Sequence, residues 1–396
     1  MDVSEGVLSR TPAASLDRWK IVWLSAAAAT LLIFVWQWSF FVGADTPRVV
    51  TYALHHGYIL AWLLLITAFT RTVALRTLAA FWFVGVFPVM AVVLVITKPI
   101  DDLAGGGEIA YAYLGPLVEE LAKALPVVLL FGYRVWRTGW QLSASDGVLL
   151  GFMVGAGFAF HEDAGYGRTW GEGLGATSWS ALFPTLGYFR GATLPYHDIL
   201  AALVGLSIGF GFLLRRYRLA RLLPFAAFLL VLSEHVTGNL RDIAGSVPFP
   251  ADVIRGVLIG GELLPIVLAI GIVAAVALES GVLRSMARRD RAFHGTSLRQ
   301  YIGALLELLR SRTFASIRRI QALRVYVRLR RALYYALWSG PLPPQRLDEA
   351  ALSLSRAASE AGVPLADGSM SDDPPRQEPL TAASETEVPA GDTDDR

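Results

Sequence analysis

Three ionisable side chains lie close together within an apolar stretch of this chain. Glu119 and Glu120 are adjacent, and Lys123 follows them within one helical turn. An ionisable side chain at the centre of a membrane helix costs about 2.5 to 3.5 kcal/mol on insertion scales, so such groups mark functional positions. Gly115 and Pro116 suit the start of a helix and place both glutamates near its first turn. Carboxylates in such a place could activate water or bind a metal ion.

The apolar stretches that follow each carry a histidine or a glutamate of their own. Glu162, His197 and His235 lie in three successive stretches, and Asn239 follows His235 by one helical turn. Small residues spaced by four precede Glu162 and follow His197, which predicts that both polar groups lie at the end of a closely packed helix seam. Glu262, in the last stretch, is a further acid, for which we expect only a supporting role.

This set of side chains suits hydrolysis. The chain has 0 cysteines, which excludes a cysteine nucleophile, thiolate metal ligands and disulfides. Zinc hydrolases use two imidazoles and one carboxylate as ligands and keep a fourth position for water, whose proton another carboxylate accepts. The same groups could also work without metal, with a glutamate activating water while a histidine and Asn239 stabilise the oxyanion. The sequence leaves the two mechanisms open.

The composition indicates an integral membrane protein. Hydrophobic residues make up 54% of the chain and charged residues only 17%, with a mean hydropathy of +0.48. These values exceed what a soluble domain tolerates. The expected fold class is therefore all-α, as a polytopic bundle of membrane helices, and the expected location is the cell membrane.

About eight apolar stretches are long enough to cross a bilayer, which takes about 20 residues. The first is too long, and lacks the small-residue cleavage site, to be a removable signal peptide. The predicted spans are 20–42, 50–70, 77–97, 110–132, 146–166, 195–214, 222–241 and 253–278.

Arginine and lysine in the short loops predict the orientation of these spans. With the N-terminus in the cytoplasm, most basic loop residues fall inside, and eight crossings leave both termini cytoplasmic. Glu119, Glu120 and His197 then lie early in inward-running helices, whereas Glu162 and His235 lie late in outward-running helices. All five are predicted in the outer half of the membrane, as a single site requires.

The chain is expected to divide into four parts. These are a cytoplasmic segment (1–19), a transmembrane protease-like core (20–280), a basic amphipathic helical extension (281–340) and an acidic disordered tail (341–396). Residues 284–346 carry 14 arginines against 2 acids, and residues 347–396 carry 12 acids against 3 arginines. The extension could lie on the anionic cytoplasmic leaflet or form a soluble helical hairpin docked on the core. We expect no binding to nucleic acid.

The segments GPLVEELAK, GFAFHED, YHD and SEHVTGN, in this order, resemble the PrsW family of intramembrane proteases. That family is similar to the larger CAAX-protease and bacteriocin-processing group of membrane peptidases. The resemblance covers about residues 110–240. Its EExxK element corresponds to Glu119–Lys123, and its FxxxE element to Phe158–Glu162, with His197 and His235 completing the set.

The resemblance implies cleavage of a membrane-anchored protein, typically an anti-sigma factor, on the extracytoplasmic side. It implies that a divalent metal, such as zinc, is a possible cofactor. If no metal binds, its candidate ligands become transition-state stabilisers. The implied roles are water activation by Glu119 and Glu120, metal binding by Glu162, His197 and His235, and support by Lys123 and Asn239.

Two other functions compete with this interpretation. A proton-coupled transporter would also place Glu, His and Lys between membrane helices, but it would distribute them along a pathway to both faces. Apart from Lys123, such residues are almost missing from the predicted inner halves of the site helices. An inactive substrate-binding scaffold would keep the same side chains without turnover.

Overall fold

The computed structural model of this chain describes most of the predicted core and part of the C-terminal extension. Within the described residues all regular structure is helical, which confirms the all-α class. The first predicted span has only two described positions, and the predicted N-terminal segment lies outside the described residues. The described ranges are 46–103, 110–165, 196–244, 263–289 and 314–363, with the isolated positions 32, 35 and 253.

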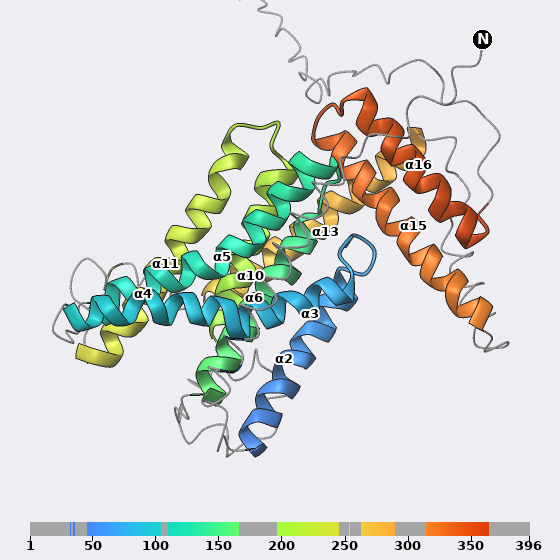
Figure 1. Ribbon diagram of the computed structural model, residues 1–396. Coiled ribbons are helices and arrows are strands. Elements are labelled where there is room, and N and C mark those ends of the chain that lie inside the picture. Colours follow the sequence, from blue (N-terminus) through green and yellow to red (C-terminus); the bar gives the residue numbers. More distant parts are fainter. Residues whose placement is uncertain are drawn as a thin grey trace, which may run out of the picture.

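The described helices form a bundle with a helical hairpin at one end (Figure 1). The bundle helices are α2 (Thr46–Ile66), α3 (Leu75–Val84), α4 (Met90–Leu103), α5 (Gly115–Tyr133), α6 (Ala144–Gly165), α10 (Tyr196–Leu213), α11 (Leu223–Ala244) and α13 (Leu263–Arg289). Short turns of helix join or extend them: the π-helical η1 (Gly85–Val89), η2 (Ala110–Leu114) and η3 (Arg134–Thr138), and the 3-10 helix η4 (Leu219–Leu222). The hairpin consists of α15 (Phe314–Ser339) and α16 (Pro344–Ala361).

Four helical segments of the described chain are long and apolar enough to cross a membrane. They are Leu75–Ile100, Ala144–Glu162, Leu219–Leu240 and Leu263–Ala287. The apolar parts of α2 and α10 are shorter, and α5 contains three ionisable residues, Glu119, Glu120 and Lys123. The protein is therefore a polytopic membrane protein, whereas the number of eight spans stays a prediction.

Helix α6 lies at the centre of the bundle, between α10 on one side and α3 with η1 on the other. Its glycines allow this close packing. A Cβ atom added at Gly151 would overlap the carbonyl oxygen of Ala201, and one at Gly205 would overlap that of Gly147. Gly157, on the opposite face of α6, meets the backbone of α3 in the same way. Contact between backbones leaves little freedom for α6 and α10 to shift, so the polar side chains at their ends are held in place.

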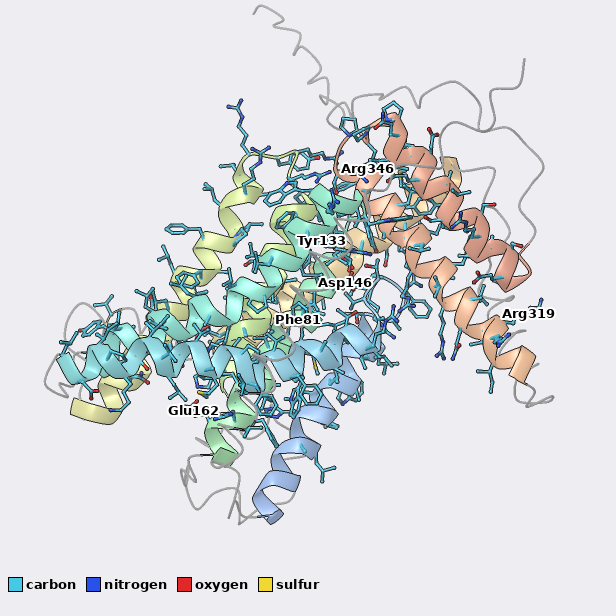
Figure 2. All side chains as sticks on the ribbon, in the orientation of Figure 1. Phe81, Tyr133, Asp146, Glu162, Arg319 and Arg346 are labelled. Atoms are coloured by element: carbon cyan, nitrogen blue, oxygen red, sulfur yellow. The ribbon has the colours of Figure 1, made fainter. Side chains whose placement is uncertain are left out.

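The two ends of α6 mark the two ends of the bundle, as Asp146 and Glu162 show in Figure 2. The Asp146 carboxylate accepts hydrogen bonds from the backbone amides of Thr72 (2.8 Å), Val73 (2.9 Å) and Ser143 (2.9 Å). These bonds fix the start of α6 to the connection between α2 and α3. We call this end the hairpin end, and the end that holds Glu162 the site end.

The predicted disorder from residue 341 onward is wrong for Pro344–Ala361, which form α16. Pro344 opens this helix, and Gly362, at φ 64°, ends it. Leu354 and Ala358 lie one turn apart on its buried face and pack with Tyr326 of α15. The overall composition of the tail is acidic and polar, but this apolar spacing is enough to bury one helix face. Residues 364–396 lie outside the described residues.

The extension was expected either on the anionic leaflet or as a helical hairpin docked on the core. The structure places α15 of the extension against the core, but its hairpin partner α16 comes from the predicted tail, and contact with the leaflet stays a prediction. Tyr335 of α15 is fully buried, and its hydroxyl donates a hydrogen bond of 2.9 Å to the carbonyl oxygen of Thr70. Helix α15 also packs against α13 and α10. The hairpin therefore rests on the ends of the core helices.

Candidate active site

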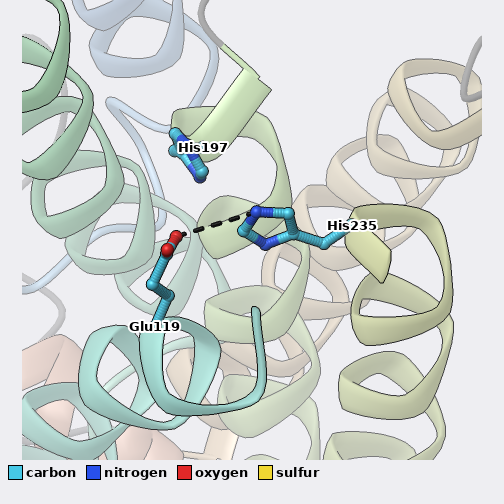
Figure 3. A group of neighbouring side chains, drawn as sticks. All are labelled: Glu119, His197 and His235. Atoms are coloured by element: carbon cyan, nitrogen blue, oxygen red, sulfur yellow. Dashed lines mark ion pairs between the residues drawn. The ribbon is translucent and has the colours of Figure 1, made fainter. Parts of the chain in front are cut away.

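Four helices bring their polar side chains together at the site end of the bundle. Glu119 comes from the first turns of α5, Glu162 from the end of α6, His197 from the start of α10, and His235 from α11. Figure 3 shows Glu119, His197 and His235 directed toward a common point. The helix directions explain the meeting, because α5 and α10 begin at the end where α6 and α11 finish.

Glu120 is linked to two partners through one oxygen. Its carboxylate is 1% exposed, and Oε1 lies 2.6 Å from Nζ of Lys123 and 2.8 Å from Nδ1 of His235. A carboxylate that accepts from Nδ1–H fixes the tautomer of the ring and leaves the lone pair on Nε2. This Nε2 atom faces Glu119, whose Oε2 lies 3.7 Å away.

His197 is held from both sides of its ring. Its Nδ1 lies 2.9 Å from Nζ of Lys123, and its Nε2 lies 2.8 Å from Oε2 of Glu162. The Phe158 ring packs edge-on against it, with ring centroids 5.0 Å apart, and Nζ of Lys123 lies 4.7 Å from the centroid of Phe158. Phe158 and Glu162, one turn apart on α6, thus both contact His197, which gives the FxxxE element a structural basis.

With its carboxylates ionised and its imidazoles neutral, the cluster would carry an excess of negative charge. Three carboxylates, those of Glu119, Glu120 and Glu162, face one ammonium group and two imidazoles that are neutral unless protonated. One oxygen of Glu119 and one of Glu120 are buried without a hydrogen-bond partner among the described residues. Buried charge without compensation is costly. A divalent cation among these groups would neutralise the excess.

The donor set at the centre fits such a cation. Glu119, His197 and His235 each offer one ligand atom, and these atoms lie within 4.8 Å of one another. Two imidazole nitrogens and one carboxylate oxygen are the donors of many catalytic zinc sites, and a carboxylate on the second nitrogen, as Glu120 provides for His235, is typical of them. The predicted set shares both histidines but contained Glu162 instead of Glu119.

One contact must change before His197 can bind a metal. A neutral imidazole has a single lone pair, and a charged Lys123 that donates to Nδ1 uses it. The proton is then on Nε2 and is donated to Glu162. Metal binding through Nε2 requires that Lys123 leaves Nδ1, after which Glu120 still holds the ammonium group.

Two predicted site residues are not linked to the cluster by the contacts above. Asn239 lies on α11 one turn beyond His235 and is half-buried, and its supporting role stays a prediction. Glu262 lies outside the described residues. A buried pair next to the cluster was not predicted from the sequence: Asp198 is fully buried, and its Oδ2 lies 3.8 Å from Nε2 of His56. The signal was present, since both are polar residues in apolar stretches and Asp198 directly follows His197.

Comparison with known proteins identifies the class of this fold and site. The family model of the PrsW family intramembrane metalloproteases matches residues 59–276, which is more than half of the chain and contains every polar residue of the cluster. The chain belongs to this family, so the protein is an intramembrane protease, and the resemblance noted in the sequence is confirmed. No curated protein and no solved structure matches the chain.

Proposed function

We propose that this protein is an endopeptidase that cuts a membrane-anchored, anti-sigma-factor-like protein near the extracytoplasmic face. The observation that carries the proposal is the meeting of Glu119, His197 and His235, with ligand atoms within 4.8 Å of one another, at one end of a membrane helix bundle. A water-activating site in that position can reach a peptide bond close to the membrane surface.

We assign Glu119, His197 and His235 as the ligands of a divalent metal, with zinc as the ion that this donor set suits best. Such an ion, when bound, polarises the scissile carbonyl and makes a water molecule more acidic. Lys123 remains paired with Glu120, and Glu120 keeps His235 in the tautomer that presents Nε2.

Glu162 is the carboxylate best placed to act as the general base. Its Oε2 contacts Nε2 of His197. When His197 binds the metal instead, this contact breaks, and the carboxylate of Glu162 is left beside the reaction centre as a proton acceptor. Glu162 accepts a proton from water as the oxygen attacks the carbonyl carbon. It returns this proton to the leaving nitrogen as the C–N bond breaks. Glu120, expected from the sequence to share in water activation, instead positions His235.

The extracytoplasmic placement depends on the predicted topology of eight spans with both termini in the cytoplasm. The chain contains 0 cysteines, so a single introduced cysteine is a unique label. Leu103, at the site end, and Leu219, at the hairpin end, are 88% and 81% exposed. In intact cells a membrane-impermeant maleimide should label Leu103→Cys and spare Leu219→Cys until lysis. The reverse pattern would contradict the orientation.

Cleavage is tested with the full-length protein in liposomes and a tethered single-pass substrate, with and without a chelator. Glu119→Gln and His235→Ala should lose both bound metal and cleavage, whereas Glu162→Gln should keep the metal and lose cleavage by about a hundredfold or more. Glu349→Gln, an exposed change of the same kind on α16, is the control.

The outcomes separate the remaining alternatives. Cleavage that needs Glu119 but survives removal of all metal would support the metal-free mechanism. Full cleavage by Glu119→Gln would overturn the site assignment. Substrate binding without cleavage by the wild type would indicate an inactive scaffold.

A further inference from the structure

A group of arginines lies where the hairpin meets the core, far from the candidate active site. The connection between α2 and α3, residues 67–74, is held against α15 by defined contacts. Nη1 of Arg331 donates to the carbonyl oxygens of Ala68 and Arg71, both at 3.1 Å, next to the bond between Tyr335 and Thr70. The two segments therefore form one surface at the hairpin end.

Four arginines gather on this surface, and we call them the basic junction: Arg71, Arg76, Arg324 and Arg328. Arg76 and Arg324 are exposed, and the other two are half-buried. Burial lowers the pKa of Arg328, and the positive charges of Arg71, Arg76 and Arg324 lower it further. The charges of the basic junction are thus close enough to repel one another, although they come from segments about 250 residues apart in sequence.

Two buried acids among the described residues, Asp146 and Glu279, lie beneath the basic junction and are bonded to other groups. Asp146 attracts Arg328, but its carboxylate accepts hydrogen bonds from the backbone amides of Thr72 and Val73. Glu279 accepts from the backbone amide of Ser145 at 2.8 Å. Both acids are fully buried, so neither carboxylate lies on the surface that the four arginines form.

The basic junction borders the apolar surface of the bundle. Leu75, the first residue of the Leu75–Ile100 span, precedes Arg76 and is 56% exposed, and Phe69 is 63% exposed. A membrane protein that changes from exposed apolar side chains to arginines within a few residues does so at the level of the lipid headgroups. Guanidinium groups bind phosphate through paired hydrogen bonds, and basic pockets next to membrane helices bind anionic headgroups.

We propose that the basic junction binds the phosphate group of an anionic phospholipid in the leaflet at the hairpin end. The bound headgroup bridges the α2–α3 connection to α15 and offsets the repulsion among the four guanidinium groups. The sequence predicted contact between the extension and an anionic leaflet. The proposal places that contact at a site formed by both the core and the hairpin. The site does not depend on the proposed proteolytic chemistry.

The test uses the full-length protein in nanodiscs that contain fluorescent phosphatidylglycerol or phosphatidylcholine, with lipid retention measured for each. Wild-type protein should prefer phosphatidylglycerol. Arg76→Gln/Arg324→Gln removes two exposed charges and should weaken this preference about tenfold to thirtyfold, given about 1 kcal/mol for each basic residue. Arg137→Gln/Arg218→Gln, two exposed arginines elsewhere at the hairpin end, is the matched control.

Each outcome of the lipid-retention experiment either supports or contradicts the proposed site. Loss of the preference in the first variant and its retention in the control would support the site. An equal loss in both would show a general charge effect and overturn it, as would no loss in either. Arg76→Lys/Arg324→Lys keeps the charge but loses the paired hydrogen bonds of the guanidinium groups, so it should retain more of the preference than the glutamine variant does. An equal loss in the lysine and glutamine variants would contradict electrostatic binding of a headgroup. If inorganic phosphate displaced the fluorescent lipid as strongly as unlabelled phosphatidylglycerol does, the site would be a general anion site, and the proposal would be contradicted.

Discussion

Nζ of Lys123 lies 2.9 Å from Nδ1 of His197, while it is also paired with Glu120 at 2.6 Å. One ammonium group thus connects a buried carboxylate with a candidate metal ligand. A charged lysine at Nδ1 forces the proton of His197 onto Nε2 and keeps the ring from binding a cation there. Lys123 therefore opposes metal binding by His197 in this arrangement, and it stabilises the cluster while no cation does so.

Replacement of Lys123 should separate these two effects. We expect Lys123→Met to lower the free energy of unfolding by about 3 to 5 kcal/mol, because it leaves the buried charge of Glu120 without its cationic partner. We expect metal binding to persist, because Nδ1 of His197 no longer accepts from an ammonium group. Thermal unfolding in detergent and metal titration measure the two quantities. The double variant Lys123→Met/Glu120→Gln should recover part of the stability; a loss equal to the sum of the single variants would contradict the pairing.

Replacement of Glu120 tests its role as a positioning residue. Glu120→Gln should weaken metal affinity about 10- to 100-fold, as loss of a carboxylate partner does for other metal-bound histidines. Titration of the metal-free protein with zinc measures this change. Glu162→Gln, a change of the same size in the same cluster, should leave the affinity close to that of the wild type. A variant Glu120→Gln with normal affinity and no cleavage would instead make Glu120 the base.

The contact between α6 and α10 can be tested at Gly151. Gly151→Val places its side chain on the backbone oxygen of Ala201, which cannot move away as a flexible side chain could. We expect destabilisation of about 3 kcal/mol or more, together with loss of cleavage, because the ends of both helices carry the site. Unfolding by heat and the substrate assay report the two effects.

The matched control is Gly281→Ala, at a helical glycine with nothing within 4 Å of an added Cβ. It should be neutral or stabilise the protein by up to about 1 kcal/mol, because alanine favours helix. Destabilisation by both changes would show that the packing argument is wrong.

The fold of the hairpin is tested by two leucines of α16 that differ in burial. Leu354 is fully buried against α15, whereas Leu352 is 56% exposed. Leu354→Ala should cost about 2 to 5 kcal/mol and open the hairpin to trypsin, which cuts at its many arginines. Leu352→Ala removes the same atoms and should leave the digestion pattern unchanged. Equal protection of both variants would contradict the packing of α16 on α15.

The ionisable residues within apolar stretches made much of the candidate site predictable from the sequence alone. Ionisable groups are costly in a membrane, so Glu119, Glu162, His197 and His235 indicated a shared site, and the alternating direction of successive spans indicated that they meet at one end. The all-helical class followed from composition, because a bilayer requires backbone hydrogen bonds to be made within each segment. The order of the motifs was enough to indicate the family.

The partners of each side chain were decided only by the tertiary structure. Sequence spacing allowed Lys123 to pair with either Glu119 or Glu120, and it could not show that Glu120 orients His235, because rotamers and helix rotations depend on packing between helices. The same limit applies to the hairpin: the acidic composition of the tail concealed the apolar face of α16, and burial of that face becomes favourable only where α15 covers it. Long-range packing, rather than local preference, determined these features.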